Sequence, residues 1–397
     1  MKEEIREETA SELTIPQMLR QMKAQNIDRR VRIAWLMNYF EKKSRLGLIP
    51  LHGVFELTPM CNLDCRMCYV HLEQYDPQQL LPVESWIWII SEARKLGMMD
   101  ATLTGGECLT YPGFDAIYIF LFEHGIRPGI LSNGLLIDDE RIAFFKRYPP
   151  KGIKITLYGS DEDAYEAVTG HRVYAQVKEN IERLRDAGLP VMVSITPNDY
   201  MLDDSRILIR TMESFDIRNE INLALLTPRN ETGRERAEAS EDRIIELYRA
   251  RREYRKIQTV LPDPCEVPYP NQEASGEALE GILCGAGRSS FTILHDGSMS
   301  PCAGLHCITT RPMKQGFPAA WRELCEKMKH YPRPMECEGC EYRGVCMPCL
   351  ALHQAAPRGH CDKRICERIH RMAMEGLISL NGRKNEEWKA RVTGSPS

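Results

Sequence analysis

From about residue 51, short apolar runs rich in β-branched residues alternate with longer segments of helical periodicity. This alternation is typical of parallel β/α units, in which each strand is followed by a helix that packs back on the sheet. The expected strands are Val54–Leu57, Ala101–Leu103, Gly129–Leu131, Ile153–Leu157, Val191–Ile195 and Ile221–Leu225. Roughly six units make a curved parallel sheet, short of the eight that close a barrel. We therefore predict an α/β fold, a partial (β/α)6 barrel with a lateral cleft.

Helix candidates lie between these strands. Glu84–Leu96 ends at Gly97, and Val177, Ile181 and Leu184 share one helical face before Gly188. A glycine after the last periodic residue is a helix stop signal. Because chemistry in such barrels gathers at the carboxyl ends of the strands, the segments that follow them are the candidate site. These segments are Thr58–Cys68, Thr104–Cys108, Ser132–Gly134, Tyr158–Ser160, Thr196–Asn198 and Thr227–Arg229.

The composition excludes several classes of protein. The 397 residues are 43% hydrophobic and 27% charged, which is ordinary for a globular chain of two or three domains. No apolar run approaches the roughly 20 residues of a membrane span, and the first residues, MKEEIREETASELT, are acidic where a signal peptide is basic and then apolar. The net charge of −4 argues against a nucleic-acid-binding surface. We expect a cytoplasmic protein with neither membrane nor nucleic acid as a partner.

The chain contains 15 cysteines. In a reducing compartment such thiols are seldom disulfides, so clusters of them are better read as metal ligands or catalytic groups. Three stand together at Cys61, Cys65 and Cys68, as C-x3-C-x2-C directly after the first strand. Three thiolates on one tight loop can hold three irons of a [4Fe–4S] cluster and leave the fourth iron open for a small molecule. The alternatives are a zinc site with a distant fourth ligand, or three thiols buried by chance.

The sequence CNLDCRMCY, followed by LTGGE and later by SNG, resembles the radical S-adenosylmethionine (SAM) superfamily over about residues 51–235. The resemblance implies that Cys61, Cys65 and Cys68 bind a [4Fe–4S] cluster. It also implies that the amino and carboxylate groups of SAM bind the open iron. The reduced cluster would then cleave SAM to a 5′-deoxyadenosyl radical that abstracts hydrogen from the substrate.

The resemblance also implies residues that contact SAM. Tyr69 matches an aromatic position near the adenine, and Gly105, Gly106 and Glu107 match the motif that receives the methionine amino group. Ser132 and Asn133 resemble residues that approach the ribose and carboxylate. Thr156 and Ser194 are weaker candidates that equally suit strand residues filling the barrel.

Cys108 stands where the family usually has proline. It is read either as a small buried thiol or as a group with a redox or substrate-contacting role.

After about residue 255 the chain becomes rich in Cys, Gly and Pro, as expected of a region folded by its metal. The order C…G-x4-C, then C-x2-C-x5-C-x2-C, then C resembles the SPASM domain, which holds two auxiliary [4Fe–4S] clusters. The implied ligands are Cys284, Cys302 and Cys349 for the first cluster and Cys337, Cys340, Cys346 and Cys361 for the second. Cys265, Cys307 or a substrate atom would complete the first, and Cys366 is an alternative to Cys361. A pair of zinc sites is the other interpretation of these spacings.

The expected organisation has four parts. Residues 1–50 form an N-terminal helical extension, 51–250 the radical SAM core, 255–370 the SPASM domain and 371–397 a C-terminal helix or tail. The extension includes a basic, helix-patterned stretch, Ile15–Leu48, that suits either a solvated helix on the barrel or a partner-binding helix. Cys325 is expected to be a core thiol.

The resemblance implies a maturase that modifies a peptide or protein, as in the formation of thioether or carbon–carbon crosslinks in ribosomally made peptides. It also implies an electron donor such as flavodoxin or ferredoxin. Alternatives are sulfatase-maturase-like oxidation of a protein Cys or Ser, radical oxidation or decarboxylation of a small non-peptide acid, and a non-catalytic iron–sulfur or zinc protein.

Overall fold

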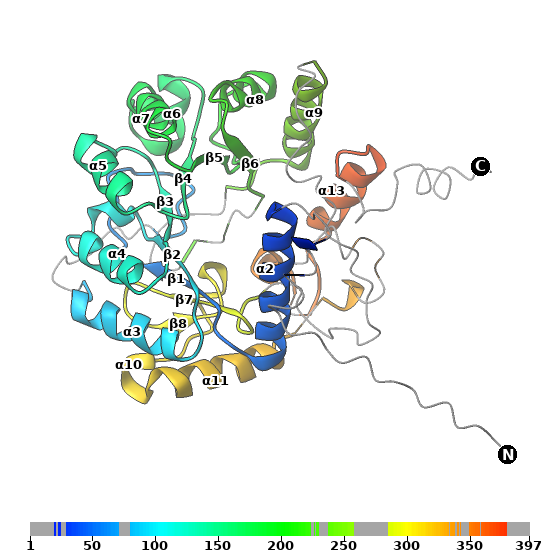
Figure 1. Ribbon diagram of the computed structural model, residues 1–397. Coiled ribbons are helices and arrows are strands. Elements are labelled where there is room, and N and C mark those ends of the chain that lie inside the picture. The colour runs from blue at the N-terminus through cyan, green and yellow to red at the C-terminus, as the bar shows by residue number, and fades with distance from the viewer. Residues whose placement is uncertain are drawn as a thin grey trace.

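The computed structural model describes one continuous sheet surrounded by helices (Figure 1). The described residues are 20, 23–24, 29–70, 80–223, 226, 228–229, 237–257, 285–332, 334–337, 340, 342, 349–357 and 359–378. Within these ranges, no helix has the length and apolar character needed to cross a membrane.

The predicted parallel sheet is confirmed. Its strands are β1 (His52–Glu56), β2 (Asp100–Thr104), β3 (Gly129–Ser132), β4 (Gly152–Thr156), β5 (Val191–Ile195), β6 (Arg218–Ile221), β7 (Ser290–Ile293) and β8 (Met299–Ser300). They lie in the order β6-β5-β4-β3-β2-β1-β7-β8, and every neighbouring pair except β7–β8 is parallel. The sixth strand ends at Ile221, where the sequence predicted it to begin. Ala224 and Leu225 of that prediction lie outside the described residues.

Helices cover the outer face of the sheet (Figure 1). They are α3 (Val83–Lys95), α4 (Phe114–Glu123), α5 (Asp139–Arg147), α6 (Glu162–Thr169), α7 (Tyr174–Asp186), α8 (Ser205–Ser214) and α9 (Glu241–Ile257). The predicted face of α7, Val177, Ile181 and Leu184, is completely buried. It packs in one core with the alternate strand residues Ile153 and Ile155. Lys154 and Thr156, which lie between and after them, therefore face the concave side of the sheet, where the strand remains partly exposed.

The sheet continues into the segment predicted to be the auxiliary domain. β7 pairs in parallel with β1, and the Phe291 ring packs against Phe55 at 6.0 Å and Phe317 at 5.4 Å. Phe317 begins α11 (Phe317–Lys329), which follows the short α10 (Pro312–Gln315). Short 3-10 helices are η2 (Cys108–Thr110), η5 (Ala303–Leu305), η6 (Met335–Cys337) and η7 (Leu352–Ala355). The barrel and this segment share one hydrophobic core.

The last described helix, α13 (Lys363–Met374), is joined to α9 by ion pairs. Arg249 contacts Glu375 at 2.6 Å, and the buried Arg368 contacts Glu241 at 3.3 Å. Cys361, just before α13, and Cys366, within it, are thereby tied to the barrel.

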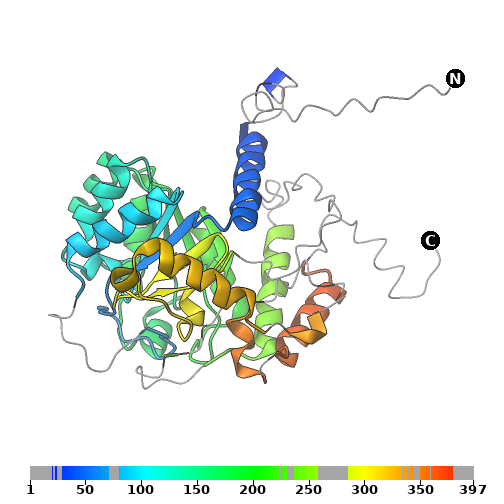
Figure 2. The same cartoon turned by 90° about the horizontal axis from the view of Figure 1, so that it is seen from below.

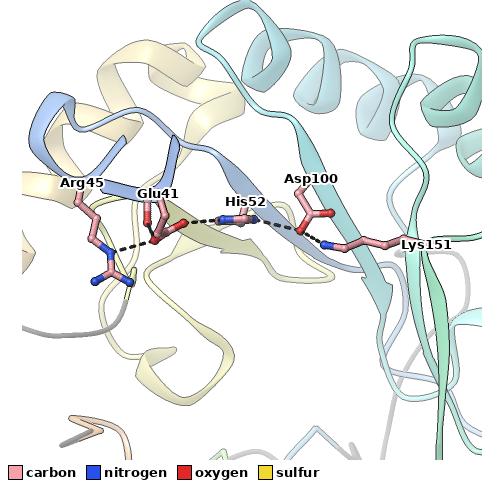
Figure 3. A network of polar contacts seen from close by, with 6 residues as sticks. Glu41, Arg45, His52, Asp100 and Lys151 are labelled. Atoms are coloured by element: carbon pink, nitrogen blue, oxygen red, sulfur yellow. Dashed lines mark hydrogen bonds and ion pairs between the residues drawn. The ribbon is translucent and has the colours of Figure 1, made fainter. Parts of the chain in front are cut away.

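The N-terminal extension is described as one helix, α2 (Arg29–Gly47), which projects from the barrel (Figure 2). A polar network at the amino-terminal edge of the sheet attaches it (Figure 3). His52 Nε2 lies 2.7 Å from Glu41 Oε2 on α2, and His52 Nδ1 lies 3.0 Å from Asp100 Oδ2 on β2. Glu41 also accepts from Ser289, and Asp100 accepts from Lys151. The helix is therefore fixed to three neighbouring strand starts.

This network is electrostatically coupled. Burial alone would lower the pKa of His52, but the hydrogen bonds and charges of Asp100 and Glu41 outweigh it and raise the pKa to about 9. The hydrogen bond from His52 is the largest cause that lowers the pKa of Glu41 to about 2. An imidazolium between two carboxylates is the expected state at neutral pH.

We predict that His52→Phe lowers the free energy of unfolding at about pH 6 by about 2 kcal/mol, because two carboxylates lose a charged donor. The His52 contribution is complete below the ordinary pKa of 6.5 and disappears as pH rises through about 9. The gap between wild type and variant, measured by chemical denaturation, should therefore shrink at higher pH.

His330→Phe is the matched control, since His330 pairs with Glu326 on the exposed face of α11. A pH-independent gap for His52→Phe, or an equal effect of His330→Phe, would contradict this account of the network.

Candidate functional site

The three clustered cysteines lie on the loop that directly follows β1. Cys65 is buried, Cys68 is half-buried and Cys61 is exposed. The carboxyl end of α6 supports this loop, because Asp64 N donates to Thr169 O at 3.0 Å and Arg66 N donates to Val168 O at 2.9 Å. The thiols are therefore presented on a loop whose backbone is held by a neighbouring helix.

Among the described residues, no three His, Cys, Asp or Glu side chains converge as a single metal ion requires. A [4Fe–4S] cluster does not need such convergence, because each thiolate binds a different iron. Three thiols on one short loop, with no fourth cysteine beside them in sequence, fit a cluster with one open iron.

The glycine pair after β2 packs directly on the cysteine loop. A side chain at Gly105 would place its Cβ 2.4 Å from Thr58 O, and one at Gly106 would place it 2.3 Å from Met60 O. Gly106 N donates to Thr58 O at 2.7 Å. The absence of side chains at these positions is what allows the β1 and β2 loops to touch.

Glu107 is completely buried, and its carboxylate joins the loops after β2 and β3. Its carboxylate accepts from Leu109 N at 3.1 Å, Ser132 Oγ at 3.1 Å and Asn133 N at 2.7 Å. Burial raises the pKa of Glu107, and these hydrogen bonds act in the opposite direction. In this structure the carboxylate braces the loops after β2 and β3, in addition to the SAM-binding role that the sequence predicts for it.

Asn133 extends the brace to the cysteine loop. Its Nδ2 donates to Asn62 Oδ1 at 2.7 Å and lies 3.7 Å from Cys61 Sγ. The structure thus brings together Cys61, Glu107, Ser132 and Asn133, which the sequence predicted to share one site.

Thr156 and Ser194 are neighbours on β4 and β5. Ser194 is buried, and its hydroxyl donates to Glu220 Oε1 at 3.3 Å. Lys154 Nζ also contacts Glu220 Oε1, at 2.5 Å. The sequence reasoning missed this Lys154–Glu220 pair, although the alternation of apolar and polar residues in β4 places Lys154 on the concave face.

A buried ion pair links β1 to the segment that follows β6. Arg229, which follows β6, donates from Nη2 to both carboxylate oxygens of Glu56 on β1, at 2.7 and 2.8 Å. Its guanidinium lies 5.5 Å from the centre of the Tyr69 ring, and its backbone N donates to Tyr69 O. The pair therefore fixes Tyr69 beside the cysteine loop. Thr227, in the same predicted segment, lies outside the described residues.

Cys108 is a completely buried thiol. Its Sγ donates to Leu131 O at 3.4 Å, and burial raises its pKa well above the ordinary value. A protonated thiol packed under the Glu107 brace matches the interpretation of Cys108 as a small core residue.

The C-terminal cysteines are described only in part. Cys265, Cys284 and Cys346 lie outside the described residues. Cys325 is buried on the inner face of α11, as expected of a core thiol. Cys361 and Cys366, the two candidates for one ligand position, have sulfur atoms 3.3 Å apart.

Residues 55–204 match the family model of the Radical SAM superfamily. These residues form a radical SAM domain. Enzymes of this family use a [4Fe–4S] cluster and SAM, which agrees with the donor set after β1. The cysteines predicted to bind two auxiliary clusters lie outside the matched residues.

Three relatives of known description match the chain over different lengths. A PqqA peptide cyclase from Streptomyces rochei is 24% identical over 272 residues, 68% of this chain and 73% of its own. An AdoMet-dependent heme synthase from Methanosarcina barkeri is 24% identical over 331 residues, 78% of this chain and 93% of its own. The sporulation killing factor maturation protein SkfB from Bacillus subtilis is 27% identical, but the match covers only 39% of this chain and 38% of its own.

Two solved structures share the fold. Streptococcus suis SuiB bound to S-adenosylmethionine has a TM-score of 0.64 at 15% identity, covering 88% of this chain and 86% of its own. The structure of anSMEcpe with bound AdoMet has a TM-score of 0.65 at 13% identity, covering 83% of this chain and 98% of its own. The shared fold thus extends well beyond residues 55–204.

We predict that Glu107→Gln lowers the free energy of unfolding by about 2 kcal/mol. The carboxylate now accepts hydrogen bonds from buried donors, and an amide NH2 in its place would face one or more of those donors without being able to accept. Cys108→Ala, which leaves those acceptors in place, should have a smaller effect. Denaturation of the metal-free proteins measures both. Equal stability of Glu107→Gln and wild type would disprove the role of Glu107 as a brace.

Proposed function

We propose that this chain is a radical SAM maturase that modifies a peptide or protein substrate, by forming a thioether or carbon–carbon crosslink. The observation that carries the proposal is the three-thiol loop braced to the loops after β2 and β3, on a fold that continues into a cysteine-rich segment. The printed names of a peptide cyclase and a killing factor maturation protein, and the SuiB structure with precursor peptide SuiA, support a peptide substrate.

In this proposal Cys61, Cys65 and Cys68 hold the cluster. When bound, the reduced cluster and SAM supply the 5′-deoxyadenosyl radical that removes hydrogen from the substrate. Gly105, Gly106, Glu107, Ser132 and Asn133 orient SAM on one side, and Tyr69, Thr156 and Ser194 complete its surroundings. The half-exposed Lys154–Glu220 pair on the concave face provides charged groups that a bound substrate could contact. The buried ion pair between Glu56 and Arg229 links β1 to the segment after β6 and helps to exclude water from the strand ends.

We further propose two auxiliary [4Fe–4S] clusters in a SPASM-type segment. Cys284, Cys302 and Cys349 would bind the first, and Cys337, Cys340, Cys346 and Cys361 the second. The proximity of Cys302 to Tyr69 supports this, since a charge on Cys302 contributes to raising the pKa of Tyr69, after the larger effect of burial. The first auxiliary cluster would then lie on the cysteine-loop side of the barrel and could take up the electron released on ring closure.

The cell must supply electrons to such an enzyme, and we propose a small carrier such as flavodoxin or ferredoxin. The exposure of Cys61 at the rim of the loop supports access by a docked carrier. A cytoplasmic setting suits the 12 described cysteines, which form no disulfide with one another.

A second candidate is radical oxidation or decarboxylation of a small tetrapyrrole-like acid, favoured by the match to 93% of the heme synthase relative. Co-expression of the chain with any short open reading frame found beside its gene separates the two. A peptide product that has lost two hydrogen atoms per crosslink, seen by mass spectrometry, is the expected result. Turnover of a porphyrin precursor with no peptide change would instead support the second candidate.

We predict that the reconstituted protein, reduced with dithionite, converts SAM to 5′-deoxyadenosine even without substrate. Cys65→Ala should reduce formation to the level of a protein-free reaction, because one cluster ligand is lost. Cys325→Ala, which removes a buried thiol on α11, should retain activity. Chromatographic detection of 5′-deoxyadenosine measures this, and equal yields from wild type and Cys65→Ala would refute radical SAM chemistry at this loop.

We also predict an iron content of about 12 per chain after anaerobic reconstitution, for three clusters of four irons. The double variant Cys337→Ala, Cys340→Ala should lose about four irons and keep the SAM cluster. An iron content of about four in the wild type would rule out the auxiliary clusters.

A further inference from the structure

The Lys154–Glu220 ion pair lies on the concave face of the sheet, where neither side chain is fully covered. Lys154 stands between the buried Ile153 and Ile155 of β4, so its side chain lies on the side of the sheet opposite the outer helices (Figure 1). Its Nζ lies 2.5 Å from Glu220 Oε1 on β6, and each side chain is 34% exposed. A ligand on the concave face can therefore reach both charged groups.

The contact directs the lysine toward the carboxyl ends of the strands. In the sheet register, Lys154 is the partner of Met192 on β5, and Met192 is the partner of Arg218 on β6. Lys154 nevertheless contacts Glu220, which lies two residues further along β6 than Arg218. The ammonium group is thus displaced toward the strand ends that carry the cysteine loop and the residues predicted to contact SAM.

The side chains beside Lys154 are apolar. Its other register partner, Leu131 on β3, is 37% exposed, and Met192 on β5 is partly exposed. Sites for small ligands usually combine apolar surface with a few charged or polar groups that fix the orientation of the ligand. The surface around Lys154 has this composition.

Positive charge exceeds negative charge on this part of the concave face. Strands β4, β5 and β6 present three charged side chains to it: Lys154, Glu220, and Arg218, which lies two residues before Glu220 on the same side of its strand. Asn219, between Arg218 and Glu220, is instead hydrogen-bonded to the outer helix α9. The excess of one positive charge favours an anionic ligand.

The two members of the pair differ in how they are held. Glu220 Oε1 also accepts from Ser194 Oγ at 3.3 Å, so the carboxylate keeps a partner when the lysine moves. Within the described ranges, Lys154 forms an ion pair with no other carboxylate. An ammonium group has three donors on a flexible stem, so it can bind a second carboxylate or turn toward one. Lys154 is therefore the member of the pair that is suited to exchange partners.

We propose that Lys154 binds a carboxylate group of the substrate and holds it beside the strand ends. Glu220 keeps the ammonium group in place before the substrate binds, and Leu131 and Met192 contact the apolar part of the substrate. This inference rests on the proposed function and narrows the substrate to one that carries a carboxylate. Such a group belongs either to an acidic residue of a peptide or to a small carboxylic acid.

The test is a binding titration followed by nuclear magnetic resonance of the lysine side chains, labelled with carbon-13, in the reconstituted full-length protein. SAM is present so that it occupies the open iron of the cluster. The probe is acetyl-glutamate N-methylamide, and the variant Lys154→Met identifies the Lys154 signal. We expect the probe to shift the Lys154 signal. The signal of Lys151, which pairs with Asp100 at the other end of the strands, should stay unchanged.

The variant Glu220→Gln decides between the two members of the pair. Removal of the competing carboxylate should strengthen binding of the glutamate probe about tenfold, because the ammonium group no longer has to leave Glu220. Acetyl-lysine N-methylamide is the matched cationic probe. If it bound the wild type, and Glu220→Gln abolished that binding, Glu220 would be the recognition residue and the proposal would be overturned.

A porphyrin with propionate side chains is the second carboxylate probe, and it distinguishes the two sources of the group. Tighter binding of the glutamate probe supports an acidic peptide residue, and tighter binding of the porphyrin supports a small acid. No shift of the Lys154 signal with either probe, or an equal shift of the Lys151 signal, would overturn the proposal. The wild-type titration stands even where a variant fails to fold. It needs no turnover, so it remains distinct from the formation of 5′-deoxyadenosine and of a peptide product, which test the proposed function.

Discussion

The buried carboxylate of Glu107 is the interaction on which the candidate site depends. It accepts from the loop after β2 through Leu109 and from the loop after β3 through Ser132 and Asn133. Asn133 then contacts Asn62 and Cys61 on the loop after β1. Three adjacent strand ends are thereby held in one arrangement, and a buried charge with these partners is costly to displace. The cysteine loop is thereby held against the loops after β2 and β3 at its Cys61 end.

The open sheet gives the proposed site one covered face and one partly exposed face. Helices cover the outer face, while the concave face keeps partly exposed polar residues such as Lys154 and Glu220. On one side the Glu56–Arg229 pair ties the loop after β6 to β1, and on the other β7 extends the sheet toward the cysteine-rich segment. These contacts place charged and polar side chains around the strand ends, where we propose that the cluster and SAM bind.

The sequence predicted the features that depend on local pattern. Alternating strands and helices identified the barrel, and the spacing of Cys61, Cys65 and Cys68 indicated the candidate site. Long-range pairs were not predictable, because nothing in the sequence near Glu56 indicates a partner at Arg229, far along the chain. The parallel pairing of β7 with β1 was missed for the same reason. The surrounding cysteine-rich sequence indicates metal binding, and a strand of four residues is too short to stand out within it. Gly105 and Gly106 were recognised, but their closest contacts are with the cysteine loop itself.

The central claim is that the braced strand ends form one site for a cluster and SAM. The most direct measurement is the electron paramagnetic resonance spectrum of the reconstituted, reduced wild-type protein before and after SAM is added. The account predicts a [4Fe–4S] signal whose g values change on addition of SAM, because SAM binds the open iron. A cluster signal that is the same with and without SAM would contradict it.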